Sequence, residues 1–141
     1  NCKNTIALID QVAKAKGAKR AIMLPMSVPS HCALLKGAAE QLRDYLENVA
    51  VQTPAIPVLH NADVAAYNDS DAIKDALVRQ LYSPVRWVET VLTFGKRGIT
   101  HNVECAPGKV LAGLNKRIDT NQQAMAINDG AALMLALTTF A

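Results

Sequence analysis

The residue with the clearest potential for chemistry is His31, which ends the segment Ser27-Val-Pro-Ser-His31. An apolar run over 20–24 leads into two prolines, Pro25 and Pro29, and an amphipathic pattern begins at Cys32. A strand-to-helix turn of this kind places a side chain on the rim of an α/β fold, which is where such enzymes keep their bases. No Gly-x-Ser-x-Gly segment occurs among the 141 residues, so the base is present without its serine.

Two interpretations of His31 are open at this point. As a structural residue, it would cap the helix that follows it. As a base, it would benefit from lying at a helix N-terminus, where the dipole disfavours the imidazolium and keeps the ring ready to accept a proton. Ser30 is then the expected N-cap residue.

Gln80 is the second candidate, because it continues an apolar stripe. In the helix predicted over 71–81, Ile73, Ala76 and Leu77 lie on one face, and Gln80 follows at i+7, i+4 and i+3. A buried amide without a partner costs about 1–3 kcal/mol, so on this face Gln80 must find partners. The alternative is that the helix frays there and the side chain points to water.

Two further motifs are less specific, and each allows a binding interpretation and a structural one. The junction over 104–109, Glu-Cys-Ala-Pro-Gly-Lys, is either an anion-binding turn before a helix or simply a tight turn for close packing. The basic pair Lys19 and Arg20 could hold a phosphate or could be a solvated edge. Neither motif matches a Walker loop or a dinucleotide fingerprint.

The sequence contains no metal-ligand spacing. His60 and His101 form no such spacing with His31, no HExxH segment occurs, and the three cysteines contain no CxxC pair. We therefore predict no metal site. The following carboxylates show no catalytic constellation: Asp10, Asp44 and Asp63.

Composition indicates one α/β domain. The chain has 141 residues, of which 50% are hydrophobic, and its net charge of +3 is too small and too evenly spread to indicate nucleic acid. No apolar run reaches membrane-spanning length, and the unpaired cysteines favour a reducing, cytoplasmic location. The chain starts at Asn1 without a methionine, so we expect it to be a piece of a longer gene product.

Hydrophobic periodicity predicts alternating helices and strands. Helices are expected over 4–16, 32–49, 71–81, 85–96, 109–117 and 130–138, and strands over 20–26, 54–59, 99–104 and 123–127. The helix over 32–49 is expected to lie on a sheet, because its charges fall mostly on one face. Turn residues occur at 61–63 and 68–70, and the latter segment provides an N-cap for the next helix.

Four blocks of the sequence carry a resemblance to a known family. They are Gly-Ala-Lys-Arg-Ala (17–21), Ser-Val-Pro-Ser-His-Cys-Ala-Leu-Leu (27–35), Asp-Ala-Leu-Val-Arg-Gln-Leu-Tyr-Ser-Pro-Val-Arg-Trp (75–87) and Pro-Gly-Lys-Val-Leu-Ala-Gly-Leu (107–114). Together they resemble the C-terminal part of bacterial malonyl-CoA:acyl carrier protein transacylase. The resemblance extends nearly from end to end, over 3–137.

The resemblance implies an α/β fold, the C-terminal portion of an α/β-hydrolase-like acyltransferase. Residues 27–141 would belong to its large domain, and residues 1–26 would be the last helix and strand of its small ferredoxin-like subdomain. The family's Gly-His-Ser-Leu-Gly elbow, its malonyl-binding arginine and its oxyanion hole have no match in this chain. The nucleophile is therefore expected in the N-terminal half of the same enzyme.

The resemblance also implies roles for the residues noted above. His31 would be the base of a ping-pong transfer of malonyl from malonyl-CoA to the phosphopantetheine thiol of acyl carrier protein, with no cofactor. The main-chain carbonyl of Gln80 would orient the His31 ring. Lys19 and Arg20 match a region suited to CoA phosphates or to the acidic carrier protein.

Two alternatives to a catalytic half-site stay open. One is a non-catalytic module that binds CoA or acyl carrier protein through Lys19 and Arg20. The other is a fragment without a function of its own. Under the favoured hypothesis, this chain alone does not transfer malonyl groups.

Overall fold

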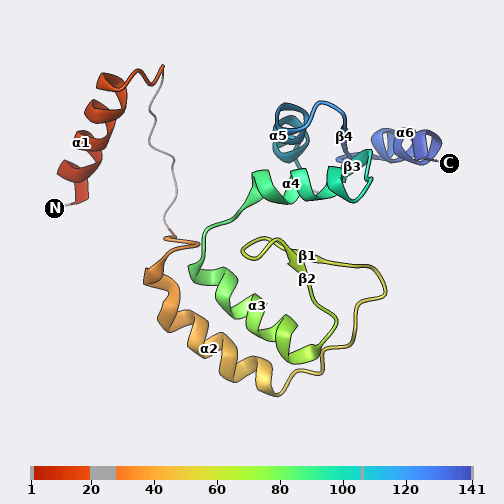
Figure 1. Ribbon diagram of the computed structural model, residues 1–141, viewed down its shortest axis with the longest axis horizontal. Coiled ribbons are helices and arrows are strands. Elements are labelled where there is room, and N and C mark those ends of the chain that lie inside the picture. Colours follow the sequence, from red (N-terminus) through yellow and green to blue (C-terminus); the bar gives the residue numbers. More distant parts are fainter. Residues whose placement is uncertain (1, 20–27, 106, 141) are drawn as a thin grey trace.

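The chain folds into helices and short strands (Figure 1). The structure is a computed structural model, and it describes residues 2–19, 28–105 and 107–140. In order, the elements are α1 (Cys2–Ala15), the 3-10 turn η1 (Ala33–Leu35), α2 (Lys36–Glu47), β1 (Leu59–His60), β2 (Ala65–Ala66), α3 (Ser70–Tyr82), α4 (Trp87–Lys96), β3 (His101–Glu104), α5 (Val110–Ile118), β4 (Gln123–Ala126) and α6 (Gly130–Phe140). The predicted strand over 20–26 lies outside the described residues.

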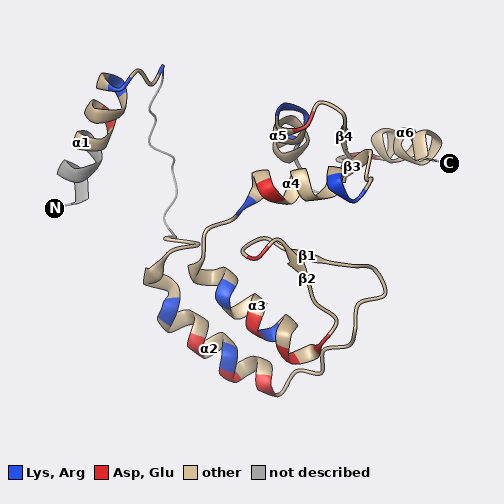
Figure 2. Cartoon of the chain, viewed as in Figure 1, with Lys and Arg blue, Asp and Glu red and all other residues tan. Residues whose placement is uncertain are grey.

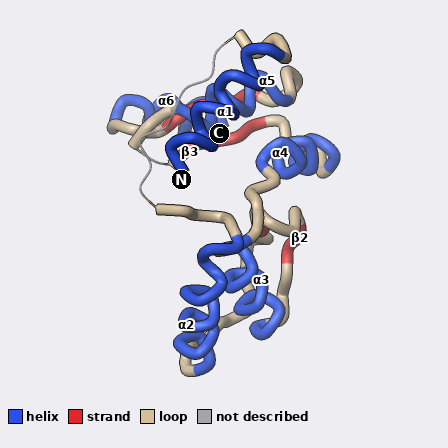
Figure 3. The backbone as a smooth tube through the Cα atoms, turned by 90° about the vertical axis from the view of Figure 1, so that its left-hand side faces the viewer, coloured by secondary structure: helices blue, strands red, loops and turns tan. Residues whose placement is uncertain are grey.

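Helices α2 and α3 pack side by side, with the β1–β2 pair next to α3 (Figures 1 and 3). Ala39 of α2 and Ala76 of α3 have no exposed surface, and such small side chains allow two helices to approach closely. Both helices carry several charged residues (Figure 2), and Arg43 of α2 contacts Asp75 of α3. The expectation that the 32–49 helix lies on a sheet is therefore wrong. It packs on another helix, and only 36–47 of it is α-helical.

The predicted strand over 54–59 is also largely wrong. Only Leu59 of that range is in a strand, and β1 pairs antiparallel with β2 through Leu59–Ala66 and His60–Ala65. Pro54 and Pro57 explain the difference, because proline has no N–H to contribute to a strand ladder. The turn predicted over 61–63 does connect β1 to β2.

The second half of the chain contains a β-α-β unit. Strands β3 and β4 pair in parallel, from His101–Gln123 to Glu104–Ala126, and α5 makes the crossover between them. This arrangement confirms the predicted α/β class. One buried apolar residue comes from each of α4, α5, β4 and α6, namely Val91, Ala112, Ala124 and Ala136.

Much apolar surface remains exposed in the described part of the chain. Helix α6 carries no charged residue (Figure 2), yet only its Ala136 is buried, and Met134 and Leu135 are 61% and 59% exposed. Among the described residues, no helix is long and apolar enough to span a membrane.

Candidate active site

His31 and the C-terminal turn of α3 form the centre of the candidate site. His31 Nδ1 lies 2.9 Å from the main-chain oxygen of Gln80, although 49 residues separate the two in sequence. The main-chain N–H of His31 donates to the oxygen of Leu81 at 3.0 Å. Both carbonyls belong to the last turn of α3, where carbonyl oxygens have no partner within the helix. His31 therefore supplies two hydrogen bonds that the helix end lacks.

The contact with Gln80 determines which tautomer the ring adopts. A carbonyl oxygen only accepts hydrogen bonds, so Nδ1 of His31 must carry the proton and donate it to Gln80. In the neutral ring, Nε2 is then the unprotonated nitrogen. Because the His31 residue is exposed, Nε2 is available to a group outside the described residues. This is the protonation pattern that a general base requires.

The backbone of His31 adopts a left-handed conformation, with φ at 59°. This region is uncommon for residues other than glycine. Such a conformation persists only where surrounding contacts maintain it, and it occurs often at functional sites. Here the two bonds to α3 are the contacts that maintain it.

The structure corrects two expectations about the surroundings of His31. Ser30 does not cap a helix, because the residue preceding η1 is Cys32, and it makes no side-chain capping bond. His31 does precede a helical segment, because η1 over Ala33–Leu35 continues directly into α2. Its ring, however, contacts the C-terminus of α3, and that end of a helix stabilises positive charge. The dipole argument therefore applies in the opposite sense to the one expected.

Gln80 is half-buried and α3 extends to Tyr82, so the helix does not fray before this residue. The helix begins with the capping chemistry predicted over 68–70. The side chain of Asp69 accepts from the N–H groups of Asp71 and Ala72 at 3.0 and 2.9 Å. The group of Gln80 that contacts His31 is its main-chain carbonyl oxygen.

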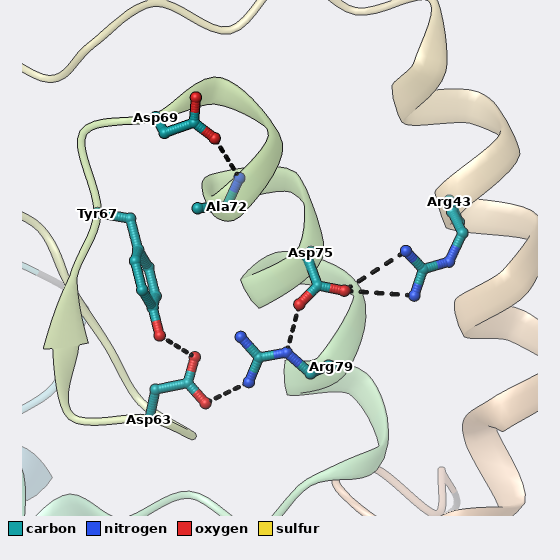
Figure 4. Close-up of polar contacts among 7 residues, drawn as sticks. All are labelled: Arg43, Asp63, Tyr67, Asp69, Ala72, Asp75 and Arg79. Carbon is teal, nitrogen blue, oxygen red and sulfur yellow. Dashed lines mark hydrogen bonds and ion pairs between the residues drawn. The ribbon is translucent and has the colours of Figure 1, made fainter.

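A charged network, which sequence inspection missed, surrounds the residue preceding Gln80 (Figure 4). Arg79 Nη1 donates to Asp63 Oδ1 at 2.5 Å, and Arg79 Nε donates to Asp75 Oδ2 at 2.6 Å. Arg43 of α2 contacts the other oxygen of Asp75 at 3.4 Å. The Asp75–Arg79 spacing of four residues could have been noticed on a helix, but nothing in the sequence pairs Asp63 with Arg79.

The network has a clear electrostatic effect. The hydrogen bonds from Arg79 hold the pKa of Asp63 and the pKa of Asp75 below their usual range, against the opposing effect of desolvation. The same two carboxylates, Asp63 first, raise the pKa of Arg79 above its ordinary value. All three groups are therefore charged at neutral pH.

The turn that carries Asp63 is itself anchored. Tyr67 Oη donates to Asp63 Oδ2 at 3.1 Å, and the N–H of Arg86 donates to the oxygen of Asn61 at 2.9 Å. Val64, next to Asp63, has a φ of 56°, a rare conformation for a β-branched residue. The strained backbones of Val64 and His31 therefore both belong to segments that contact the last turn of α3.

The anion-binding reading of the 104–109 junction is wrong. The carboxylate of Glu104 accepts from the N–H of Leu111 at 3.3 Å and from the N–H of Ala112 at 2.8 Å. These are first-turn amides of α5, so the chain supplies its own anion to the helix N-terminus. Gly108 does not adopt the positive φ that a special turn would require.

Among the remaining candidates, those that the structure describes make no contact with His31 or Gln80. Lys19 is exposed, no contact with His31 or Gln80 is seen for it, and Arg20 lies outside the described residues. His60 is buried against Tyr67, with ring centroids 5.4 Å apart, whereas His101 is an exposed residue of β3. Over the part of the chain that the structure describes, no cluster of metal-ligating side chains occurs.

Comparison with known proteins identifies the relatives of this chain. No protein-family model matches it. The malonyl CoA-acyl carrier protein transacylase of Salmonella typhimurium is 48% identical over 136 residues, which cover 96% of this chain and 44% of that protein. The acyl-carrier-protein S-malonyltransferase structure from Burkholderia pseudomallei matches with a TM-score of 0.89 and 53% identity, over 94% of this chain and 43% of that one. The chain is therefore similar to the C-terminal part of the malonyl CoA-acyl carrier protein transacylases.

One solved relative of these transacylases includes a partner. A malonyl-transacylase in complex with a type II PKS acyl-carrier protein matches with a TM-score of 0.92 and 47% identity, over 97% of this chain and 44% of that one. The chain thus spans less than half the length of the transacylases that it matches. The family resemblance seen in the four sequence blocks is confirmed.

Proposed function

We propose that this chain provides the histidine half of a Ser–His acyltransferase site that moves malonyl from malonyl-CoA to the phosphopantetheine thiol of acyl carrier protein. The observation that carries the proposal is the 2.9 Å contact between His31 Nδ1 and the Gln80 oxygen, which leaves Nε2 as the basic nitrogen. The relationship to malonyl CoA-acyl carrier protein transacylases supplies the reaction class.

In the proposed reaction, His31 moves one proton in each half. In the first half, Nε2 takes the proton of a serine hydroxyl as its oxygen attacks the malonyl thioester. The carbon–sulfur bond then breaks, and the proton goes to the departing CoA thiolate. In the second half, Nε2 takes the proton of the carrier-protein thiol, whose sulfur attacks the malonyl-serine ester. The serine oxygen leaves and recovers the proton.

The C-terminal turn of α3 assists both halves of the proposed reaction. When Nε2 holds the extra proton, the ring is an imidazolium whose Nδ1–H still donates to Gln80. The carbonyl end of α3 stabilises that positive charge through the helix dipole, so no carboxylate is needed beside the ring. Gln80 therefore takes the orienting role that an aspartate has in a Ser-His-Asp triad.

The serine is proposed to come from outside these 141 residues, because they contain no Gly-x-Ser-x-Gly elbow. Its source would be an N-terminal half of the same enzyme. In the same proposal, residues 27–141 belong to the large domain and residues 1–26 to a smaller one.

Lys19 and Arg20 remain proposed contacts for CoA phosphates or carrier protein. No cofactor takes part in the proposed reaction, and its cytoplasmic location stays a prediction.

The proposal is tested with a chimera. The matched segment of the Salmonella typhimurium transacylase is replaced by these 141 residues, and malonyl transfer to holo acyl carrier protein is measured for the chimera and for the chain alone. The chimera is expected to turn over and the chain alone to be inactive. In the chimera, His31→Ala should lower the rate by about 10²–10⁴-fold.

His101→Ala is the matched control, because it removes another exposed histidine that has no contact with α3, and it should leave the rate unchanged. An active His31→Ala chimera would remove His31 as the base. Turnover by the chain alone would contradict the external serine. A non-catalytic module would instead bind carrier protein in a salt-sensitive way and give an inactive chimera.

A further inference from the structure

The charged network around Arg79 leads directly to the residue that orients His31. Arg79 lies in the last turn of α3, and the next two residues, Gln80 and Leu81, provide the two carbonyls that His31 contacts. We propose that Asp63, acting through Arg79, is a positioning residue for His31. This inference rests on the proposed role of His31 as a base.

The two carbonyls that contact His31 lie at the end of α3. The last turn of a helix has unpaired carbonyls and frays most readily. This turn is followed by Ser83-Pro84, and proline cannot continue the helix. The carbonyls of Gln80 and Leu81 can hold the His31 ring and main chain only if this turn keeps its place.

Arg79 holds this turn from two directions. Its Nε contacts Asp75 at 2.6 Å, one helical turn earlier, and its Nη1 contacts Asp63 at 2.5 Å. The contact with Asp75 remains within α3, so it moves with the helix. Asp63 belongs to the β1–β2 turn and therefore provides an anchor outside the helix. The guanidinium is suited to this because it can donate to two carboxylates at once in a fixed plane.

The Asp63 carboxylate is itself held in place and partly shielded from solvent. The Asp63 side chain is 16% exposed, compared with 44% for Asp75, so its ion pair with Arg79 is the less screened of the two. Tyr67 holds the second carboxylate oxygen of Asp63. The left-handed Val64 beside it indicates that the turn keeps a costly backbone shape.

The test uses the 141-residue chain with 15N-labelled histidine. At a pH where the ring is neutral, the ring 15N chemical shifts report whether Nδ1 or Nε2 carries the proton. In the parent chain, Nδ1–H should predominate at His31. In Asp63→Asn and in Arg79→Gln, the population should move toward Nε2–H, and the His31 main-chain N–H should exchange about tenfold faster with solvent.

Arg43→Gln is the matched control, because it also removes an arginine that contacts Asp75, but from α2 and away from the last turn of α3. It should keep the parent tautomer and the parent exchange rate. The proposal is overturned if Asp63→Asn and Arg79→Gln retain the parent values while circular dichroism shows the parent helix content. It is also overturned if Arg43→Gln changes His31 as much as they do.

If Asp63→Asn does not fold, Tyr67→Phe replaces it, because this change removes only one hydrogen bond to Asp63. Exchange of the His31 N–H should then rise about threefold, and a parent-like rate would overturn the proposal. None of these measurements needs catalysis. A failure of the Asp63 proposal is therefore distinct from a failure of His31 in the activity assay.

Discussion

Gly95, near the end of α4, is a position where two opposing effects of one methyl group can be compared. Alanine is favoured over glycine inside a helix by about 1 kcal/mol. However, a Cβ at Gly95 would lie 2.7 Å from Asp119 Oδ2 and 3.0 Å from Gln122 Nε2. Those two atoms are hydrogen-bonded to each other at 2.7 Å, so the methyl group would force them to move.

The cost of this movement follows from the burial of Gln122, which is 4% exposed. Its Nε2 also donates to the oxygen of Val91 at 2.9 Å. Displacing the amide breaks at least one bond of a buried group, at about 1–3 kcal/mol. The loss exceeds the gain in helix propensity, so Gly95→Ala should lower the free energy of unfolding by about 1 kcal/mol.

Gly113 is the matched control, because it lies inside α5 with no atom within 4 Å of its added Cβ. Gly113→Ala should therefore raise the free energy of unfolding by about 0.5–1 kcal/mol. Urea unfolding, followed by the fluorescence of the single tryptophan, Trp87, measures both variants. The two midpoints should move in opposite directions. The packing argument is refuted if Gly95→Ala stabilises the chain as much as Gly113→Ala does.

Two further predictions concern charge. Glu104→Gln should lower the free energy of unfolding by about 1 kcal/mol, because it removes the negative charge from the N-terminus of α5. Thermal unfolding checks this, with Glu40→Gln, a change at a 66% exposed carboxylate, as a nearly neutral control, and equal effects would argue against capping. The second prediction is a pH dependence. Because the pKa values of Asp63 and Asp75 are lowered by Arg79, their stabilising effect is present above their ordinary pKa and is lost as the pH falls below about 4. Urea unfolding at a series of pH values should show a shallower acid loss for Asp63→Asn than for the parent, and parallel curves would contradict it.

The sequence pattern was most informative where neighbouring residues decide the structure. The helix over 71–81 was recognisable from its apolar spacing and from the capping residues before it, and Asp69 does cap α3. The helix predicted to end near Gly17 does so, and that glycine has a positive φ of 89°. In such cases the relevant interactions lie within one or two helical turns.

The pattern failed where distant segments compete for the same groups. The residues over 104–109 left an external anion open as one of two interpretations, yet Glu104 fills the α5 N-terminus itself. Apolar spacing predicted one continuous helix from Cys32, but the segment first makes a 3-10 turn, next to a histidine that bonds to α3. Periodicity decides neither point, because it does not report contacts between separate elements.

The sequence by itself determined the family resemblance, because four long blocks spread over the chain match the family residue by residue. It also determined that no Gly-x-Ser-x-Gly segment occurs among the 141 residues, since that is a property of residue order. The contact of the His31 ring with the Gln80 carbonyl was implied by the family resemblance, whereas the pairing of Asp63 with Arg79 was decided by the tertiary structure alone. The physical reason is that a helix end leaves carbonyls unpaired and a salt bridge needs an opposite charge. Folding decides which distant group meets each need.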